Sequence, residues 1–166
     1  TTSAKLYGFT GAEFISNATV AISVFNTSPV GTVGSASLAT NNTDIYFAVG
    51  NKLYKTNTTL STLTPSAGLA LGTLTTNFTN STPLVDSGNF VFIGGADGRL
   101  YRVNGATMAD PGDTWNVVNF TGWPKRIGVG TTAASAAGAL AMDGSGNLYA
   151  PSIDDSLRRF GAAATA

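Results

Sequence analysis

The chain is poor in the side chains that carry out most enzymatic chemistry. Its 166 residues include no Cys and no His, and nine acidic residues stand against nine Lys and Arg. Without thiols and imidazoles there is no thiolate nucleophile, no thiolate metal site and no Ser-His-Asp triad. Acid–base catalysis would have to use carboxylates, and eight of these nine are Asp in turn-like contexts. We therefore expect a protein that is not an enzyme.

One segment has the oxygen spacing of a metal loop. Asp143, Ser145 and Asn147 place oxygen-bearing side chains at alternate positions, as the start of a calcium loop does. No Glu stands at the closing position, and Asp86-Ser-Gly-Asn89 occupies the same place in its own segment. We favour the interpretation that both segments are tight turns. A Ca²⁺ site is the alternative, and we expect no other cofactor. Asp154-Asp155 is a weaker candidate, without an acidic neighbour to tune a catalytic pair.

One cluster combines aromatic and basic side chains. It consists of Trp115, Phe120, Trp123, Lys125 and Arg126. An exposed Trp beside basic neighbours can stack on a sugar ring. We expect Trp115 in the core and Trp123 at the surface of an inserted loop, so Trp123, Lys125 and Arg126 form the candidate carbohydrate site.

Acceptor sites for N-glycosylation are numerous. The seven Asn-X-Ser/Thr sequons begin at Asn17, Asn26, Asn41, Asn57, Asn77, Asn80 and Asn119. Chance would give roughly three in a chain of this composition, although a Thr- and Asn-rich protein produces some without function. We expect a secreted, glycosylated surface protein, with Asn26 weakened as an acceptor by the nearby Pro29.

The elements that would position these residues follow from an internal repeat. Residues 38–57, 84–104 and 140–160 align, and residues 4–10 match the end of the same unit. The anchoring leucines are Leu6, Leu53, Leu100 and Leu157, with two equal intervals followed by a longer one. A period in the forties with several short strands is typical of β-propeller blades. The expected division is a partial blade 1–35 and three blades at 36–81, 82–137 and 138–166.

Turn residues divide each blade into strands of an antiparallel four-stranded sheet. Asn, Asp and Gly clusters supply the positive φ values that tight hairpins need. Second strands are predicted at 45–49, 90–93 and 148–150, and third strands at 52–55, 99–102 and 157–160. Outer fourth strands are predicted at 22–26, 75–79 and 115–121. Helix content should be close to nil.

The third strands concentrate the basic residues. Seven of the nine lie there: Lys5, Lys52, Lys55, Arg99, Arg102, Arg158 and Arg159. Such a band could meet an acidic glycan or a partner subunit, but protection of sheet edges is the favoured interpretation. Tyr7, Tyr54 and Tyr101 are expected to pack between blades with their hydroxyls at the rim.

The segment from Asp86 to Thr107, with Trp115 after it, resembles the pyrroloquinoline-quinone-like (PQQ-like) propeller repeat. Met142–Tyr149 is equally similar to the repeats of NHL-type and gluconolactonase-like propellers. The resemblance implies a propeller fold over residues 36–160. It does not imply quinoprotein activity, because the acidic calcium-binding cluster and vicinal Cys pair of those enzymes are not recognisable. Many members of such families act as scaffolds, and that role is the implication we retain.

About three and a half blades do not make a ring, since propellers usually need at least four. Either the sequence belongs to a longer chain, or copies complete each other in a ring or a filament. The start, Thr1–Lys5, has no signal-peptide stretch, so we expect a mature chain or an excerpt. The balanced charge gives no reason to expect nucleic acid as a partner, and no apolar run is long enough for a membrane span.

The function expected from these features is that of an extracellular, glycosylated structural protein, a scaffold subunit of a surface assembly or filament. The alternative is a lectin-like propeller that binds glycans. A fragment of a propeller enzyme of the lactonase or quinoprotein type is the least favoured hypothesis.

Overall fold

The chain is built from β-strands. A computed structural model describes residues 4–8, 23–27, 38–50, 52–71, 81–95, 97–109, 122–127, 138–152 and 155–161. Within these ranges there is no helix, and hence none that is long and apolar enough to cross a membrane. The strands are β1 (Ala4–Gly8), β2 (Ser23–Thr27), β3 (Ala39–Thr40), β4 (Asp44–Val49), β5 (Lys52–Asn57), β6 (Leu63–Ala70), β7 (Ser81–Thr82), β8 (Leu84–Val85), β9 (Phe90–Gly94), β10 (Arg99–Asn104), β11 (Lys125–Arg126), β12 (Gly138–Ala139), β13 (Ala141–Met142), β14 (Leu148–Pro151) and β15 (Leu157–Phe160).

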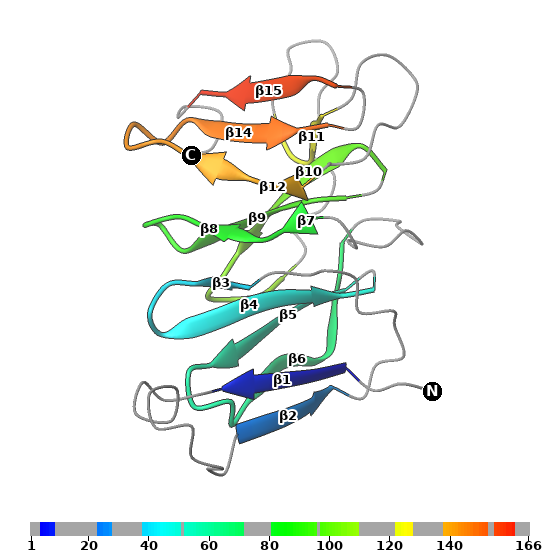
Figure 1. Cartoon of the computed structure of the whole chain (residues 1–166), viewed down its shortest axis with the longest axis vertical. Coiled ribbons are helices and arrows are strands. Elements are labelled where there is room, and N and C mark those ends of the chain that lie inside the picture. The colour runs from blue at the N-terminus through cyan, green and yellow to red at the C-terminus, as the bar shows by residue number, and fades with distance from the viewer. Residues whose placement is uncertain are drawn as a thin grey trace.

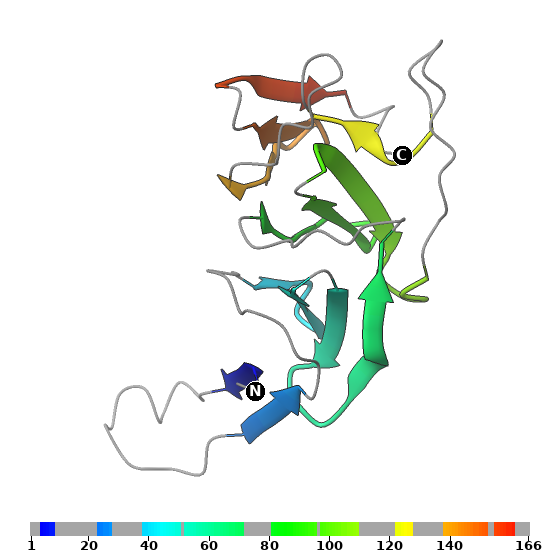
Figure 2. The same ribbon diagram turned by 90° about the vertical axis from the view of Figure 1, so that its right-hand side faces the viewer.

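The strands form four antiparallel sheets in chain order. We name them the N-terminal sheet (β1-β2), the second sheet (β3-β4-β5-β6), the third sheet (β8-β9-β10-β11) and the C-terminal sheet (β13-β14-β15). Figure 1 shows them stacked along the long axis, with the N-terminal sheet at the bottom and the C-terminal sheet at the top, and Figure 2 shows the same order from the side. The stack is open rather than closed into a ring. The predicted fold class, all-β with propeller-type blades, is confirmed.

A short parallel pair joins the upper part of the stack. β7 pairs with β12 through Ser81↔Gly138 and Thr82↔Ala139. The Ser81 hydroxyl also accepts a hydrogen bond from the Gly94 amide at 2.9 Å. The strands that immediately precede β8 and β13 thus hydrogen-bond to each other, which links the third sheet to the C-terminal sheet.

The predicted second and third strands are confirmed in the second, third and C-terminal sheets, and turn residues fix their ends. Asn42 (φ 73°), Asn89 (φ 61°) and Gly146 (φ 78°) occupy the left-handed region just before β4, β9 and β14. Asn and Gly tolerate this conformation better than other residues do. Gly98 (φ 76°) does the same between β9 and β10.

The fourth strands differ from the prediction in two sheets. β2 matches the predicted strand at 22–26, but β6 is the outer partner of β5 in the second sheet and β11 that of β10 in the third. The segments predicted instead, 75–79 and 115–121, lie outside the described residues. β6 contains Pro65 and Gly68, which disfavour interior strands and are tolerated at an edge or bulge.

Side chains alternate along the strands, so each sheet has two faces. We call the face toward the C-terminal end of the stack the upper face and the face toward the N-terminal end the lower face. At the junction of the second and third sheets, Tyr46, Ala48 and Leu53 share a core with Val91, Ile93, Tyr101 and Val103. At the next junction, Phe92, Leu100 and Trp123 share a core with Leu148 and Ala150. The apolar cores therefore lie between sheets. Each sheet falls within one of the four expected ranges, and the division into blades itself stays a prediction.

Candidate functional site

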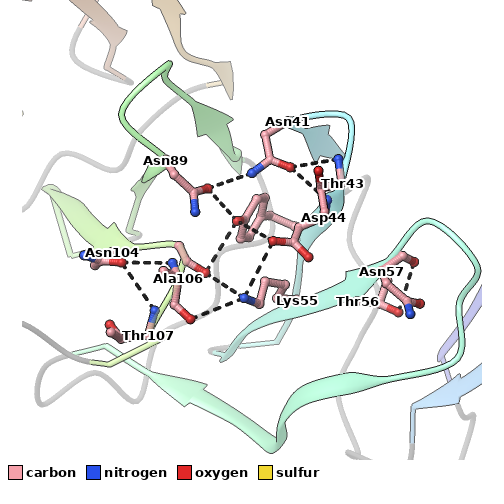
Figure 3. A network of polar contacts seen from close by, with 12 residues as sticks. Asn41, Thr43, Asp44, Lys55, Thr56, Asn57, Asn89, Asn104, Ala106 and Thr107 are labelled. Carbon is pink, nitrogen blue, oxygen red and sulfur yellow. Dashed lines mark hydrogen bonds and ion pairs between the residues drawn. The ribbon is translucent and has the colours of Figure 1, made fainter.

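A polar network closes the rim of the junction between the second and third sheets (Figure 3). Asn89, in the turn before β9, is its centre. Its side-chain oxygen accepts hydrogen bonds from the Tyr46 hydroxyl and from Asn41 Nδ2, both at 2.8 Å. Its backbone oxygen accepts from the Gly105 amide at 2.8 Å. One turn of the third sheet is thereby fixed to two residues of the second.

Lys55 crosses the same junction. It is half-buried, and its ammonium donates to the backbone oxygen of Gly105 at 2.8 Å and to that of Ala106 at 3.4 Å. Asp44 lies 3.7 Å from the same ammonium, within the second sheet. Figure 3 shows Lys55 reaching from β5 to the turn after β10. This basic side chain therefore ties two sheets together.

The tyrosines differ in how their hydroxyls are placed. Burial, with the nearby Asp44 carboxylate, raises the pKa of Tyr46 to about 12. Tyr101 donates to Asp97 at 2.8 Å, and burial raises its pKa even further. Tyr54 is fully buried against Phe47, and its hydroxyl has no hydrogen-bond partner among the described residues. The expectation of a rim hydroxyl is wrong for Tyr54, and the side chain of Tyr7 lies outside the described residues.

The predicted carbohydrate site is part of the next junction. Trp123 is only 6% exposed and packs against Phe92, with ring centroids 5.6 Å apart. Its expected surface position is therefore wrong. The Arg102 guanidinium lies 5.3 Å from the Trp123 ring, and the Lys125 ammonium lies 5.5 Å from it. Such cation–π contacts compensate buried cations in part.

Of the two basic residues of that predicted site, one is buried and one is exposed. Lys125 is 5% exposed, whereas Arg126 is exposed. Burial lowers the pKa of Lys125, and the positive charge of Arg102 lowers it further. Trp115 and Phe120 lie outside the described residues. Trp123 itself lies in the apolar core between the third sheet and the C-terminal sheet.

The candidate metal loop is a hydrogen-bonded turn. Asp143 Oδ1 accepts from the amides of Ser145 and Asn147, at 3.0 and 2.9 Å. Its Oδ2 accepts from Asn147 Nδ2 at 2.8 Å and from the Tyr149 hydroxyl at 3.1 Å. These bonds, those from Asn147 first, lower the pKa of Asp143 to about 2.

No group of three or more acidic, His or Cys side chains in the described ranges could hold a metal. The expected ligand Asn147 instead accepts a hydrogen bond from Arg159 through Oδ1, at 3.0 Å. Asp155 adopts φ 60° in the turn before β15, and Asp154 lies outside the described residues. The geometry gives Asp143 and Asn147 a role in the turn and its contacts.

Three predicted glycosylation residues lie within the described ranges. Asn26 is in β2, opposite Lys5. Asn41 is in the turn before β4, where its side-chain oxygen accepts from the Asp44 amide at 2.8 Å. Asn57 ends β5 and donates to the Ser61 hydroxyl at 2.7 Å. The remaining acceptors, Asn17, Asn77, Asn80 and Asn119, lie outside the described residues, and occupancy stays a prediction.

The C-terminal sheet presents its upper face to solvent. Leu157 is 67% exposed, whereas Leu53 and Leu100, at the same position of the repeat, are 0% exposed. Tyr149 pairs with Arg159 and Pro151 with Leu157, so these four residues share that face. On the opposite face Leu148 and Ala150 are fully buried. The sequence alignment marks Leu157 as equivalent to Leu53 and Leu100, but only the structure shows that no described residue covers it.

The comparisons with known proteins find remote structural likeness. No protein-family model matches the sequence, and no curated protein does. BamB from Moraxella catarrhalis is similar with a TM-score of 0.45 and 16% identity, over 88% of this chain and 54% of the BamB chain. The computationally designed Ika4 protein has a TM-score of 0.34 and 12% identity, over 81% of this chain and 94% of Ika4. This chain thus spans about half the length of BamB. Likeness this remote leaves function to be inferred from the residues of the chain itself.

Proposed function

We propose that the chain is an extracellular, glycosylated structural protein, a non-enzymatic subunit of a surface assembly or filament. It acts through contacts between strands and sheet faces, and belongs among the PQQ-like or NHL-type repeat proteins. The observation that carries this proposal is the uncovered upper face of the C-terminal sheet. A leucine at a position that is fully buried in the two preceding sheets is 67% exposed there.

Two further features support a structural role. Described carboxylates such as Asp143 and Asp44 take part in turns and sheet junctions. The composition, rich in Thr and Asn and with only 11% charged residues, supplies many sequons and few ionic groups. Such a surface suits a glycoprotein that contacts its neighbours through β-sheets.

The experiment uses the chain isolated from its source. Negative-stain electron microscopy is expected to show rings or filaments. The denatured intact mass is expected to fall by glycan-sized increments when a glycosidase is added. Assemblies without glycan would overturn the glycoprotein part of the proposal. A chain that stays a monomer at all concentrations would overturn its structural part.

A further inference from the structure

We propose that the upper face of the C-terminal sheet binds the N-terminal sheet of a second copy of this chain, head to tail. We call this face the docking face and define it by Asn147, Tyr149, Leu157 and Arg159. The inference rests on the proposed function and names the partner and the surface of that assembly.

The docking face repeats the upper face of the second sheet, which the third sheet covers. Tyr149 pairs with Arg159 in the C-terminal sheet, as Tyr46 pairs with Lys55 in the second. Both tyrosine hydroxyls contact a carboxylate of their own sheet, Asp143 at 3.1 Å and Asp44 at 3.4 Å. The two faces thus carry an aromatic hydroxyl, a basic residue and a leucine in the same arrangement.

The basic residue has a similar local partner on both faces. Lys55 lies 3.7 Å from Asp44, the first residue of β4. Arg159 donates to Asn147, which directly precedes β14, at 3.0 Å. Lys55 also binds two backbone carbonyls of the sheet above it. Because Arg has five N–H donors, Arg159 keeps donors for carbonyls of a docked sheet.

The apolar part of the face indicates a sheet as the occupant. Leu53 and Leu100 are fully buried by the lower face of the next sheet. Burial of Leu157 by an equivalent surface would remove its apolar area from water, which is the main driving force of association. A free sugar or a charged ligand would leave that leucine without apolar contacts.

The sequence indicates that the occupant comes from the other end of the stack. Lys5-Leu6-Tyr7 repeats Arg99-Leu100-Tyr101 of β10, the strand that contributes Tyr101 to the lower face of the third sheet. Gly11-Ala12 follow Leu6 at the interval at which Gly105-Ala106 follow Leu100. Because the two ends of the stack are different surfaces, their contact is heterologous. It forms a filament or, if the rotation closes, a ring.

The first test compares two exposed leucines. Leu157→Asp places a negative charge on the docking face. Leu38→Asp places the same charge outside that face, at a position where the leucine is 48% exposed. Sedimentation velocity is expected to show Leu157→Asp as a monomer at concentrations at which the wild type and Leu38→Asp assemble. Assembly of Leu157→Asp to the wild-type extent would overturn the docking face and leave the proposed function intact. A wild type that never assembles would overturn both.

The second test identifies the partner surface by disulfide cross-linking. Because the sequence has no cysteine, only the introduced cysteines can form disulfides. Leu157→Cys is mixed with Leu6→Cys or with Tyr7→Cys and mildly oxidised. Adjacent residues of a strand point to opposite faces, so one of the two mixtures is expected to give a cross-linked dimer between different variants. Dimers of Leu157→Cys alone, or no cross-link in either mixture, would overturn the head-to-tail arrangement. The matched control is Leu38→Cys, expected to cross-link to neither β1 position.

Discussion

The hydroxyl of Tyr46 donates a hydrogen bond to the side-chain oxygen of Asn89, at 2.8 Å, across the junction of two sheets. The two residues are 43 positions apart, close to the interval between Leu53 and Leu100. The second sheet is therefore joined to the third by polar contacts at the rim and by an apolar core inside it. The C-terminal sheet carries the same kind of side chains on a face that no described residue covers.

Removing two tyrosine hydroxyls should have different effects. Tyr46→Phe loses the bond to Asn89, and we expect a loss of about 1 kcal/mol in the free energy of unfolding. The cost stays near this value because Asn41 still donates to the Asn89 oxygen. Tyr54→Phe removes a buried hydroxyl that has no partner among the described residues, so stability should be unchanged or higher. Urea denaturation of both variants provides the measurement, and equal losses would contradict this account of the junction.

Gly105 should tolerate no side chain. A Cβ there would lie 2.5 Å from the Tyr46 hydroxyl and 2.7 Å from the backbone oxygen of Asn89. Because backbone cannot move aside as a flexible side chain can, Gly105→Ala should cost about 1–3 kcal/mol. Gly144→Ala is the matched control, since its Cβ would meet nothing within 4 Å. The two free energies of unfolding should differ, and a Gly105→Ala variant as stable as Gly144→Ala would argue against the observed turn.

Trp123 should matter for stability rather than for sugar binding. Because it is 6% exposed and packs on Phe92, Trp123→Ala should destabilise the chain by about 3–5 kcal/mol. Leu38→Ala, at an exposed site, should change stability by no more than about 0.5 kcal/mol. Thermal or urea unfolding measures both. An unchanged stability of Trp123→Ala would restore the surface position expected from the sequence.

Stability should fall at alkaline pH. The pKa of Tyr46 is about 12 in the folded chain against 10.0 for a free side chain, and the pKa values of Tyr101 and Tyr54 are raised by burial as well. Between these values the unfolded chain has released the proton and the folded chain has kept it. The contribution of Tyr46 to the free energy of unfolding is therefore fully present below pH 10 and is lost as pH rises toward 12.

The measurement is urea unfolding as a function of pH, with tyrosinate absorbance as a second readout. Tyr46→Phe is expected to show a shallower decline between pH 10 and 12 than the wild type. Parallel declines in the two proteins would show that Tyr46 titrates normally.

The inner strands are well predicted from the sequence, because Asn, Asp and Gly mark their turns. Asn42 and Asn89 adopt positive φ in the turns before β4 and β9, where the turn clusters predict it. Two outer strands are predicted poorly. β6 contains Pro65 and Gly68, which interrupt the alternating pattern, and its Gly68 is needed because a Cβ there would collide with the Tyr54 ring. β11 has only two residues, too few for a pattern.

The candidate site is harder to predict, because residue type does not reveal which surface a side chain meets. Trp123 beside Lys125 is equally typical of a sugar site and of a buried cation–π stack, and only the fold distinguishes them. Edge protection is the sequence-based interpretation of Lys55 and Arg158, yet they donate to backbone oxygens of Gly105 and Ile127, which lie outside their own sheets. The exposure of Leu157 could not be foreseen either, since its place in the repeat matches two buried leucines.

The measurement that tests the central claim most directly is the mass distribution of the wild-type chain as a function of concentration. Sedimentation velocity of the 166-residue chain should show a monomer of 16.9 kDa plus any attached glycan at low concentration and, as the concentration rises, larger species at multiples of that mass. Copies joined head to tail by the exposed face of the C-terminal sheet would behave in this way. A single monomeric species at every concentration would contradict the claim that this chain is a subunit of an assembly.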